Sequence, residues 1–289
     1  MKRQQMSVVL VVLALWLAAC GTPGAINQVA RSRTGEVRLV AQWPVEGAPD
    51  GIAVGPDGNV YVTINNSHRV VRYSPQGEVL AQWPIEDEAA AIAAGPEGTV
   101  YVTINNSHRV VQYNPQGELL TQWPVECAEC GVIETNGIAV GPDGSVYVNI
   151  NNTHRVVRYS AAGEYLGEWA YEGEAAGIAA GPESTVYVTI NNSHRVVQYS
   201  SRGKPLGQWE VSCRDCGVIE TNGIAVGPDG SVYVNINNTH RVVRYSAAGE
   251  YLGEWVYEGQ AAGLAAGPEG LVYIADRAGS RVLGFQTRP

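Results

Sequence analysis

All five histidines of this chain lie in one repeated polar phrase. "TINNSHR" stands at residues 63–69, 103–109 and 189–195, and the near-copy "NINNTHR" at 149–155 and 235–241. The histidines are His68, His108, His154, His194 and His240. Histidine titrates near neutral pH, but a general base serves one atom of one substrate, and five equivalent copies cannot all do so. We therefore expect a structural ring, stacked between repeats or hydrogen-bonded to a neighbouring loop. The preceding asparagines tolerate the left-handed conformation that tight turns require.

Four cysteines supply a second candidate chemistry. Cys127 and Cys130 frame "CAEC", and Cys213 and Cys216 frame "CRDC". In a reducing cytosol, two such pairs would favour a four-cysteine zinc site. In an exported protein, each pair favours a small disulfide ring within its own loop. A thioredoxin-type redox motif needs a helix after the first cysteine, and "CAECGVIETNG" predicts none. We expect two disulfides, with zinc or redox use as the alternatives.

The spacing of these motifs follows an internal repeat. Variants of "GIAVGPDG" begin six units, at Gly51, Ala91, Gly137, Gly177, Gly223 and Gly263. The first unit contains four runs typical of short strands, "GIAVG", "NVYVTI", "HRVVRYS" and "EVLAQWP", which are separated by turn residues. Four strands in a unit of about 40 residues are typical of a propeller blade. The sequence therefore predicts an all-β, six-bladed propeller, with a solenoid as the alternative.

The two ends of the repeat region complement each other. The last unit ends at "RVLGFQTRP" and lacks a fourth run, whereas "EVRLVAQWP" at 36–44 is a fourth run without a unit. We expect the N-terminal strand to complete the last blade, which hides an otherwise open sheet edge. The propeller domain would then span 36–289. Each blade would hold one tryptophan from the set Trp43, Trp83, Trp123, Trp169, Trp209 and Trp255.

The words of the repeat resemble a known family. "GIAVGPDGNVYV", followed by "HRVVRY" and a turn glycine, resembles the NHL repeat, and this resemblance covers residues 36–289. It implies the same six-bladed propeller. The family usually has an aspartate at the end of the second strand, but only the last blade keeps it, as Asp276. The contact that this aspartate makes to the following arginine in relatives is therefore not implied for the other five blades.

The blade topology assigns the motifs to faces. Turns after second strands and connections between blades emerge on one face, so the "NNSH" turns and the CxxC loops share it. We call this the NNSH face and the opposite one the GPDG face. First strands are innermost, and the residue before them is Asp50, Asn136 or Asn222 in alternate blades but alanine in the others. These three oxygen-bearing side chains at the channel mouth would suit calcium or magnesium, helped by Glu134 and Glu220. The alternative is that they serve the local turn.

The first 20 residues predict export. A cationic start, "MKRQQ", precedes the apolar run "MSVVLVVLALWLAAC". Its end, "LAAC" at 17–20, resembles the bacterial lipobox. This resemblance implies a signal peptide at 1–19, a lipidated tether at 20–35 and Cys20 as the lipid-bearing residue. It also implies an extracytoplasmic protein, anchored by lipid to the outer membrane or to the outer face of the plasma membrane. An ordinary signal peptide or an uncleaved anchor helix is the alternative.

The net charge of the chain and the similarity of its repeats limit the functions that we expect. A formal net charge of −9 argues against nucleic-acid partners. Uniform blades without a unique nucleophile or base favour a non-enzymatic module that binds a protein, peptide or glycan through the NNSH face. The alternative is an enzyme, because "GPDGNVYV" is also similar to virginiamycin B lyase and, more remotely, to lactonase propellers. That similarity implies a metal-dependent lyase or hydrolase with its cation near the channel.

Overall fold

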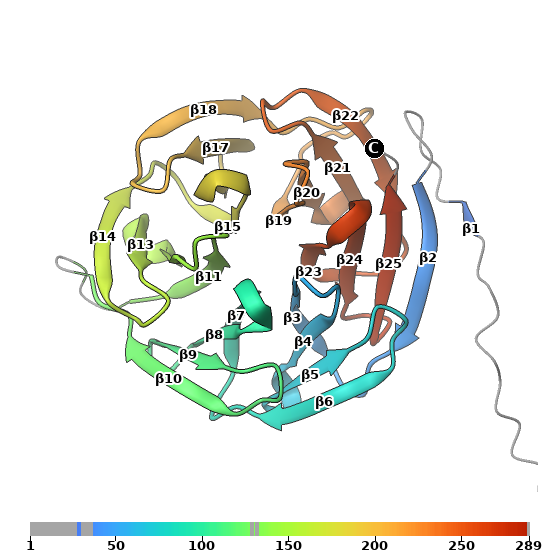
Figure 1. The fold of residues 1–289 in the computed structure, drawn as a ribbon. Coiled ribbons are helices and arrows are strands. Elements are labelled where there is room, and N and C mark those ends of the chain that lie inside the picture. The colour runs from blue at the N-terminus through green and yellow to red at the C-terminus, as the bar shows by residue number, and fades with distance from the viewer. Residues whose placement is uncertain (1–27, 30–36, 128–129, 131–132, 288–289) are drawn as a thin grey trace, which may run out of the picture.

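The computed structural model describes residues 28–29, 37–127, 130 and 133–287. The described strands form six antiparallel sheets arranged as a ring around a central channel, with the first strand of each blade innermost (Figure 1). This confirms the predicted six-bladed, all-β propeller. The signal peptide, Cys20 and all of the tether except residues 28–29 lie outside the described residues, so what we expect of them stays a prediction. In the part of the chain that is described, no helix is long and apolar enough to cross a membrane.

The first three blades follow the repeat in sequence order. Blade one contains β3 (Pro49–Val54), β4 (Val60–Ile64), β5 (Arg69–Tyr73) and β6 (Val79–Pro84). Blade two contains β7 (Ala89–Ala94), β8 (Val100–Ile104), β9 (Arg109–Tyr113) and β10 (Leu119–Pro124). Blade three contains β11 (Thr135–Val140), β12 (Val146–Ile150), β13 (Arg155–Tyr159) and β14 (Tyr165–Ala170).

The last three blades continue the pattern. Blade four contains β15 (Ala175–Ala180), β16 (Val186–Ile190), β17 (Arg195–Tyr199) and β18 (Pro205–Glu210). Blade five contains β19 (Thr221–Val226), β20 (Val232–Ile236), β21 (Arg241–Tyr245) and β22 (Tyr251–Val256). Blade six contains β23 (Ala261–Ala266), β24 (Leu271–Asp276), β25 (Arg281–Thr287), the N-terminal β2 (Val37–Pro44) and the short β1 (Gln28–Val29).

Short 3-10 turns alternate around the ring. In blades one, three and five a turn follows the second strand: η1 (Asn65–Ser67), η3 (Asn151–Thr153) and η5 (Asn237–Thr239). In blades two, four and six a turn precedes the second strand: η2 (Pro96–Gly98), η4 (Pro182–Ser184) and η6 (Pro268–Gly270). Odd and even blades therefore differ at both faces, in a three-fold pattern within the six-fold ring.

The ring closes as the sequence predicted. β2 pairs antiparallel with β25, with Trp43 opposite Val282 and Pro44 opposite Arg281. The N-terminal strand β2 thus completes the sheet that the C-terminal strand leaves open. This pairing protects an edge that would otherwise expose unpaired backbone groups.

Aromatic side chains hold neighbouring blades together. Trp83 lies between Tyr61 of its own blade, at 6.4 Å, and Tyr113 of the next, at 5.8 Å between ring centroids. Trp43 occupies the same position at the closure, between Tyr273 and Tyr73. Such tilted and edge-to-face pairs are favourable beyond the area they bury. The one tryptophan per blade is therefore an interface residue between blades.

The third-to-fourth turn needs glycine for the same interface. Gly77 has φ +90°, and a Cβ at this position would lie 2.6 Å from the indole of Trp43. Both the left-handed conformation and the close approach exclude a side chain. Together with the fully buried "VYVTI" type of second strand, this packing places the core between blades.

Candidate functional site

The "NNSH" turns are built around a left-handed histidine. In blade one, residues 65–67 form the 3-10 turn, and His68 closes it with φ 44° and its N–H donating to the Asn65 carbonyl at 3.2 Å. We expected the asparagines to take the left-handed conformation, and this was wrong, because they form the body of the turn. The other four histidines also have positive φ, and Ser280 takes the position in the last blade. The backbone role therefore does not require an imidazole.

The histidine rings contact aromatic neighbours and loops. His154 packs against Tyr171 at 5.9 Å and His240 against Tyr257 at 6.0 Å between ring centroids. The Nδ1 atom of His240 also contacts the Gly259 carbonyl. None of the five histidines is among the residues that line the channel mouth on the NNSH face. The structure thus places them around that mouth and outside it.

The two asparagines of the turn form hydrogen bonds with different partners. The Asn65 amide donates to the Ala89 carbonyl at 3.1 Å and accepts from the Ala89 N–H at 3.2 Å, which joins blade one to blade two. The second asparagine accepts from the incoming loop of its own blade, as Asn152 Oδ1 does from the Glu134 N–H at 3.1 Å. A paired carboxamide can donate and accept at once, which explains why asparagine recurs here.

The channel mouth on the NNSH face is a polar pocket of about 470 Å³. Its lining combines carboxamides and a few charged groups with alanines: Asp50, Ala90, Asn136, Asn151, Glu174, Ala175, Ala176, Asn191, Thr221, Asn222, Asn237, Gln260, Ala261, Ala262 and Arg277. Asp50, Asn136 and Asn222 therefore lie around one pocket. Glu134 and Glu220 are not among its lining residues, and Glu174 lines it instead. We expected the two glutamates to help from upstream, but their connections bring only their backbone to the Asn152 and Asn238 side chains.

Arg277 is a charged pocket residue that sequence reasoning missed, as it also missed Glu174. Its guanidinium forms an ion pair with Asp50 Oδ1, while Asn65 donates to Asp50 Oδ2 at 2.7 Å. Both carboxylate oxygens are therefore engaged. Arg277 belongs to "IADRAGSR", where the last blade departs from the "NNSH" phrase. That departure from the repeat was the signal that could have found it.

The residues at this mouth do not fit a divalent cation. Calcium and magnesium need several oxygen ligands, usually including carboxylates. The one carboxylate of the trio is already paired with Arg277. Asn136 and Asn222 add only neutral carboxamide oxygens, while their amide N–H groups donate to the carbonyls of Ala175, at 3.3 Å, and Ala261, at 3.2 Å. In the described ranges, no three side chains drawn from histidine, cysteine, aspartate and glutamate lie close enough together to hold a metal ion.

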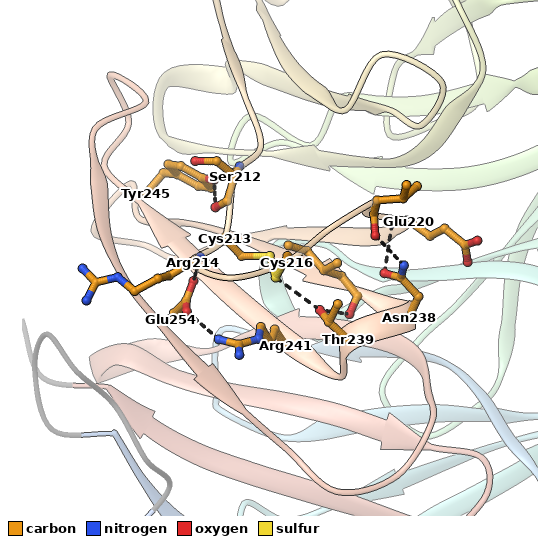
Figure 2. The surroundings of a disulfide bond; sticks show 12 residues. Ser212, Cys213, Arg214, Cys216, Glu220, Asn238, Thr239, Arg241, Tyr245 and Glu254 are labelled. Atoms are coloured by element: carbon orange, nitrogen blue, oxygen red, sulfur yellow. Dashed lines mark hydrogen bonds and ion pairs between the residues drawn. A yellow bond between two sulfur atoms is a disulfide. The ribbon is translucent and has the colours of Figure 1, made fainter.

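Each CxxC motif forms a disulfide, Cys127–Cys130 and Cys213–Cys216. This confirms the preferred reading of these motifs. Figure 2 shows how blade five anchors the second loop. The Tyr245 hydroxyl accepts from the Ser212 N–H at 2.9 Å and donates to the Ser212 carbonyl at 3.1 Å. The Arg214 N–H donates to Glu254, which also pairs with Arg241. At the other end the Glu220 N–H donates to Asn238 at 3.1 Å, so the loop is fixed at both ends on the NNSH face.

In the last blade, the aspartate at the end of the second strand forms an ion pair with the arginine that begins the third strand. Asp276 is fully buried, and its Oδ2 accepts from the Nε atom of Arg281 at 2.7 Å. Its Oδ1 accepts from the N–H groups of Gln260, at 2.8 Å, and Gly279, at 3.1 Å. This network fixes the turn that carries Arg277 into the pocket.

Comparisons with known proteins agree with the fold. The model of the virginiamycin B lyase family matches residues 39–175. No curated protein matches the chain. A solved streptogramin B lyase is 15% identical with a TM-score of 0.66, covering 87% of this chain and 98% of that one. Virginiamycin B lyase from Staphylococcus aureus is 14% identical with a TM-score of 0.64, covering 87% of this chain and 99% of that one. A gluconolactonase from Xanthomonas campestris is 13% identical with a TM-score of 0.69, covering 91% of this chain and 99% of that one. The resemblance to the NHL repeat stays a prediction.

Proposed function

We propose that this propeller is a binding module that takes a small, hydroxyl-rich ligand of the glycan class at the NNSH-face channel mouth. The observation that carries the proposal is the pocket of about 470 Å³ lined by carboxamides and by the Asp50–Arg277 pair. Small-molecule sites are commonly concave and about 300–1,000 Å³ in volume. The pocket suits a monosaccharide-sized ligand better than it suits a flat protein surface.

The chemistry of the lining favours hydroxyl groups. A carboxamide offers both donors and acceptors, as a sugar hydroxyl does. The amide N–H groups of Asn136 and Asn222 are used by backbone carbonyls, which directs their acceptor oxygens to other partners. The Arg277 side chain is 51% exposed, so guanidinium N–H groups outside the Asp50 pair are open to a ligand. The proposed ligand would exchange hydrogen bonds with this ring of amides.

A sugar panel tests the proposal. Glucose, galactose, gluconate and galacturonate would be titrated against the purified propeller by calorimetry. We expect saturable binding of at least one of them, one molecule per chain. The Asn136→Ala/Asn222→Ala double variant should weaken it at least about tenfold, as the loss of one or two hydrogen bonds does. Gln116→Ala changes an exposed carboxamide on the GPDG face and serves as the matched control. Absence of binding by all four sugars would reject the proposal.

A second candidate is a lyase, which the family match over residues 39–175 favours. A catalytically inactive histidine variant of the Staphylococcus aureus lyase has been solved with quinupristin. Incubation of this chain with quinupristin, with and without added magnesium, tests the candidate by chromatography. Consumption of quinupristin by the chain, but not by buffer, would favour the lyase over the binding module. An unchanged quinupristin peak after prolonged incubation would remove the lyase.

A further inference from the structure

The opposite end of the channel is an apolar cup. It has a volume of about 730 Å³ and opens on the GPDG face. One small aliphatic residue per blade forms its wall: Val54, Ala94, Val140, Ala180, Val226 and Ala266. Each is followed by a glycine and a proline that also line the cup. The channel therefore has a polar mouth at one end and an apolar mouth at the other.

Every blade places one acid directly after the cup-lining proline. The acids of the odd blades are neutralised by arginines of the third strand. Asp57 pairs with Arg72 at 3.0 Å, and Asp229 pairs with Arg244 at 3.2 Å. In blade three, Asp143 forms the equivalent ion pair with Arg158 at 3.4 Å.

The acids of the even blades are not neutralised. They are Glu97, Glu183 and Glu269. The positions of the odd-blade arginines hold Gln112, Gln198 and Gly284 in these blades. Across the described residues, no ion pair forms with any of the three glutamates. Glu183 itself lines the cup. Three uncompensated carboxylates thus alternate around an apolar cavity.

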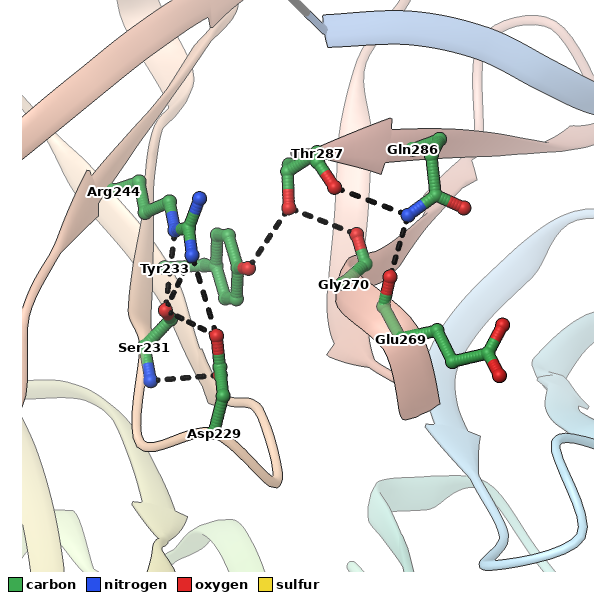
Figure 3. A network of polar contacts seen from close by, with 8 residues as sticks. All are labelled: Asp229, Ser231, Tyr233, Arg244, Glu269, Gly270, Gln286 and Thr287. Carbon is green, nitrogen blue, oxygen red and sulfur yellow. Dashed lines mark hydrogen bonds and ion pairs between the residues drawn. The ribbon is translucent and has the colours of Figure 1, made fainter. Parts of the chain in front are cut away.

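Blade six shows how the backbone of the turn is held while the acid stays free. Gln286 donates to the Glu269 carbonyl at 2.5 Å, and the Thr287 hydroxyl donates to the Gly270 carbonyl at 2.9 Å (Figure 3). The same Thr287 hydroxyl meets the Tyr233 hydroxyl of blade five at 3.2 Å. In Figure 3 the Glu269 carboxylate makes none of the drawn contacts. Its charge is therefore available to a partner outside the turn.

We propose that this cup binds an organic cation with an apolar body, such as an aromatic quaternary ammonium ion. The wall of valine, alanine and proline favours removal of an apolar group from water. The three free glutamates attract positive charge and repel anions, and the formal net charge of −9 adds to this preference. A hydrated metal ion gains nothing from an apolar wall, and a neutral apolar molecule gains nothing from the acids. This site is independent of the proposed ligand at the NNSH-face mouth.

Benzyltrimethylammonium is the probe, with phenylacetate as an anion of similar size. Calorimetry at low ionic strength should show one benzyltrimethylammonium bound per chain and no phenylacetate. Removing three charges in the Glu97→Gln/Glu183→Gln/Glu269→Gln variant should weaken binding at least about tenfold. The control Glu78→Gln/Glu118→Gln/Glu164→Gln makes the same charge change at exposed turns of the same face, and should have a clearly smaller effect.

A second variant tests the cavity itself. Ala94→Leu/Ala180→Leu fills part of the cup and should also weaken the cation, whereas Asn136→Ala/Asn222→Ala at the opposite mouth should leave it unchanged. Melting curves of each variant verify folding. No saturable binding of the cation, equal binding of phenylacetate, or equal losses in the two glutamine triples would each overturn the proposal.

Discussion

Arg277 of blade six forms an ion pair with Asp50 of blade one at the channel mouth. The pair joins the two blades at which the chain closes its ring, at the channel, whereas the β2–β25 pairing closes the ring at the outer side of blade six. It also places the protein's own cation against the carboxylate that would otherwise hold a metal. The relationship therefore shapes both the closure and the chemistry of the candidate site.

Calcium and magnesium should not stabilise the propeller. A ligand that binds only the native state raises the melting temperature, and Asp50 is already paired. We expect the melting temperature of chelator-treated protein to be unchanged by millimolar additions of either cation. A rise that Asp50→Ala abolishes would contradict this and restore the cation site that the alternating trio first indicated.

Asp276→Ala should strongly destabilise the fold. The carboxylate is fully buried and holds Arg281 together with two backbone N–H groups. Removing one member of a buried ion pair typically costs about 3–5 kcal/mol. Chemical denaturation should show a loss of this size, against about 0–1 kcal/mol for Glu46→Ala, which breaks an exposed pair with Arg69. Equal losses in the two variants would count against this role.

Gly77 and Trp43 should be energetically coupled. A Cβ on Gly77 would lie 2.6 Å from the Trp43 ring, so Gly77→Ala forces two blades apart and should cost about 1–3 kcal/mol. Trp43→Ala should cost about 3–5 kcal/mol by leaving a cavity. Because the smaller residue makes room, the double variant should lose less than the sum of the two. Strict additivity in urea unfolding would show that the contact does not matter.

Stability should fall at alkaline pH through buried tyrosines. Burial raises the pKa of Tyr159 to about 12, and its hydroxyl bonds the backbone of Glu126. The unfolded chain loses this proton near pH 10 while the folded chain keeps it. Stability is therefore complete below about pH 10 and decreases by about 1.4 kcal/mol per pH unit per such tyrosine up to about pH 12. Tyr159→Phe should make the measured decrease shallower, and an unchanged slope would refute this assignment.

Cys20→Ala should prevent lipid attachment. The basic start, the apolar run and "LAAC" agree in predicting cleavage before Cys20. Cells that express the variant should accumulate a precursor without labelled fatty acid, whereas the native chain takes up the label. Equal labelling of both chains would exclude lipidation at this residue.

The sequence by itself was sufficient for the blades and the closure, and it favoured the disulfides over a zinc site. Strand runs, turn residues and loop cysteines are local signals. Once six units were counted, the fourth run at 36–44 could complete only the last blade, which lacks a fourth strand of its own. Local turn detail was less accessible. The left-handed residue proved to be His68 and its equivalents, because a 3-10 turn of asparagines needs such a residue to close it.

Only the tertiary structure decided which side chains meet at the two channel mouths. Asp50 and Arg277 lie near opposite ends of the sequence and become neighbours only when blade six packs against blade one. Glu174 lines the polar pocket, whereas Glu134, at the equivalent position before the first strand of blade three, does not. Repeats encode short-range structure in every unit alike, whereas the contents of a central channel depend on how six different copies converge on one axis.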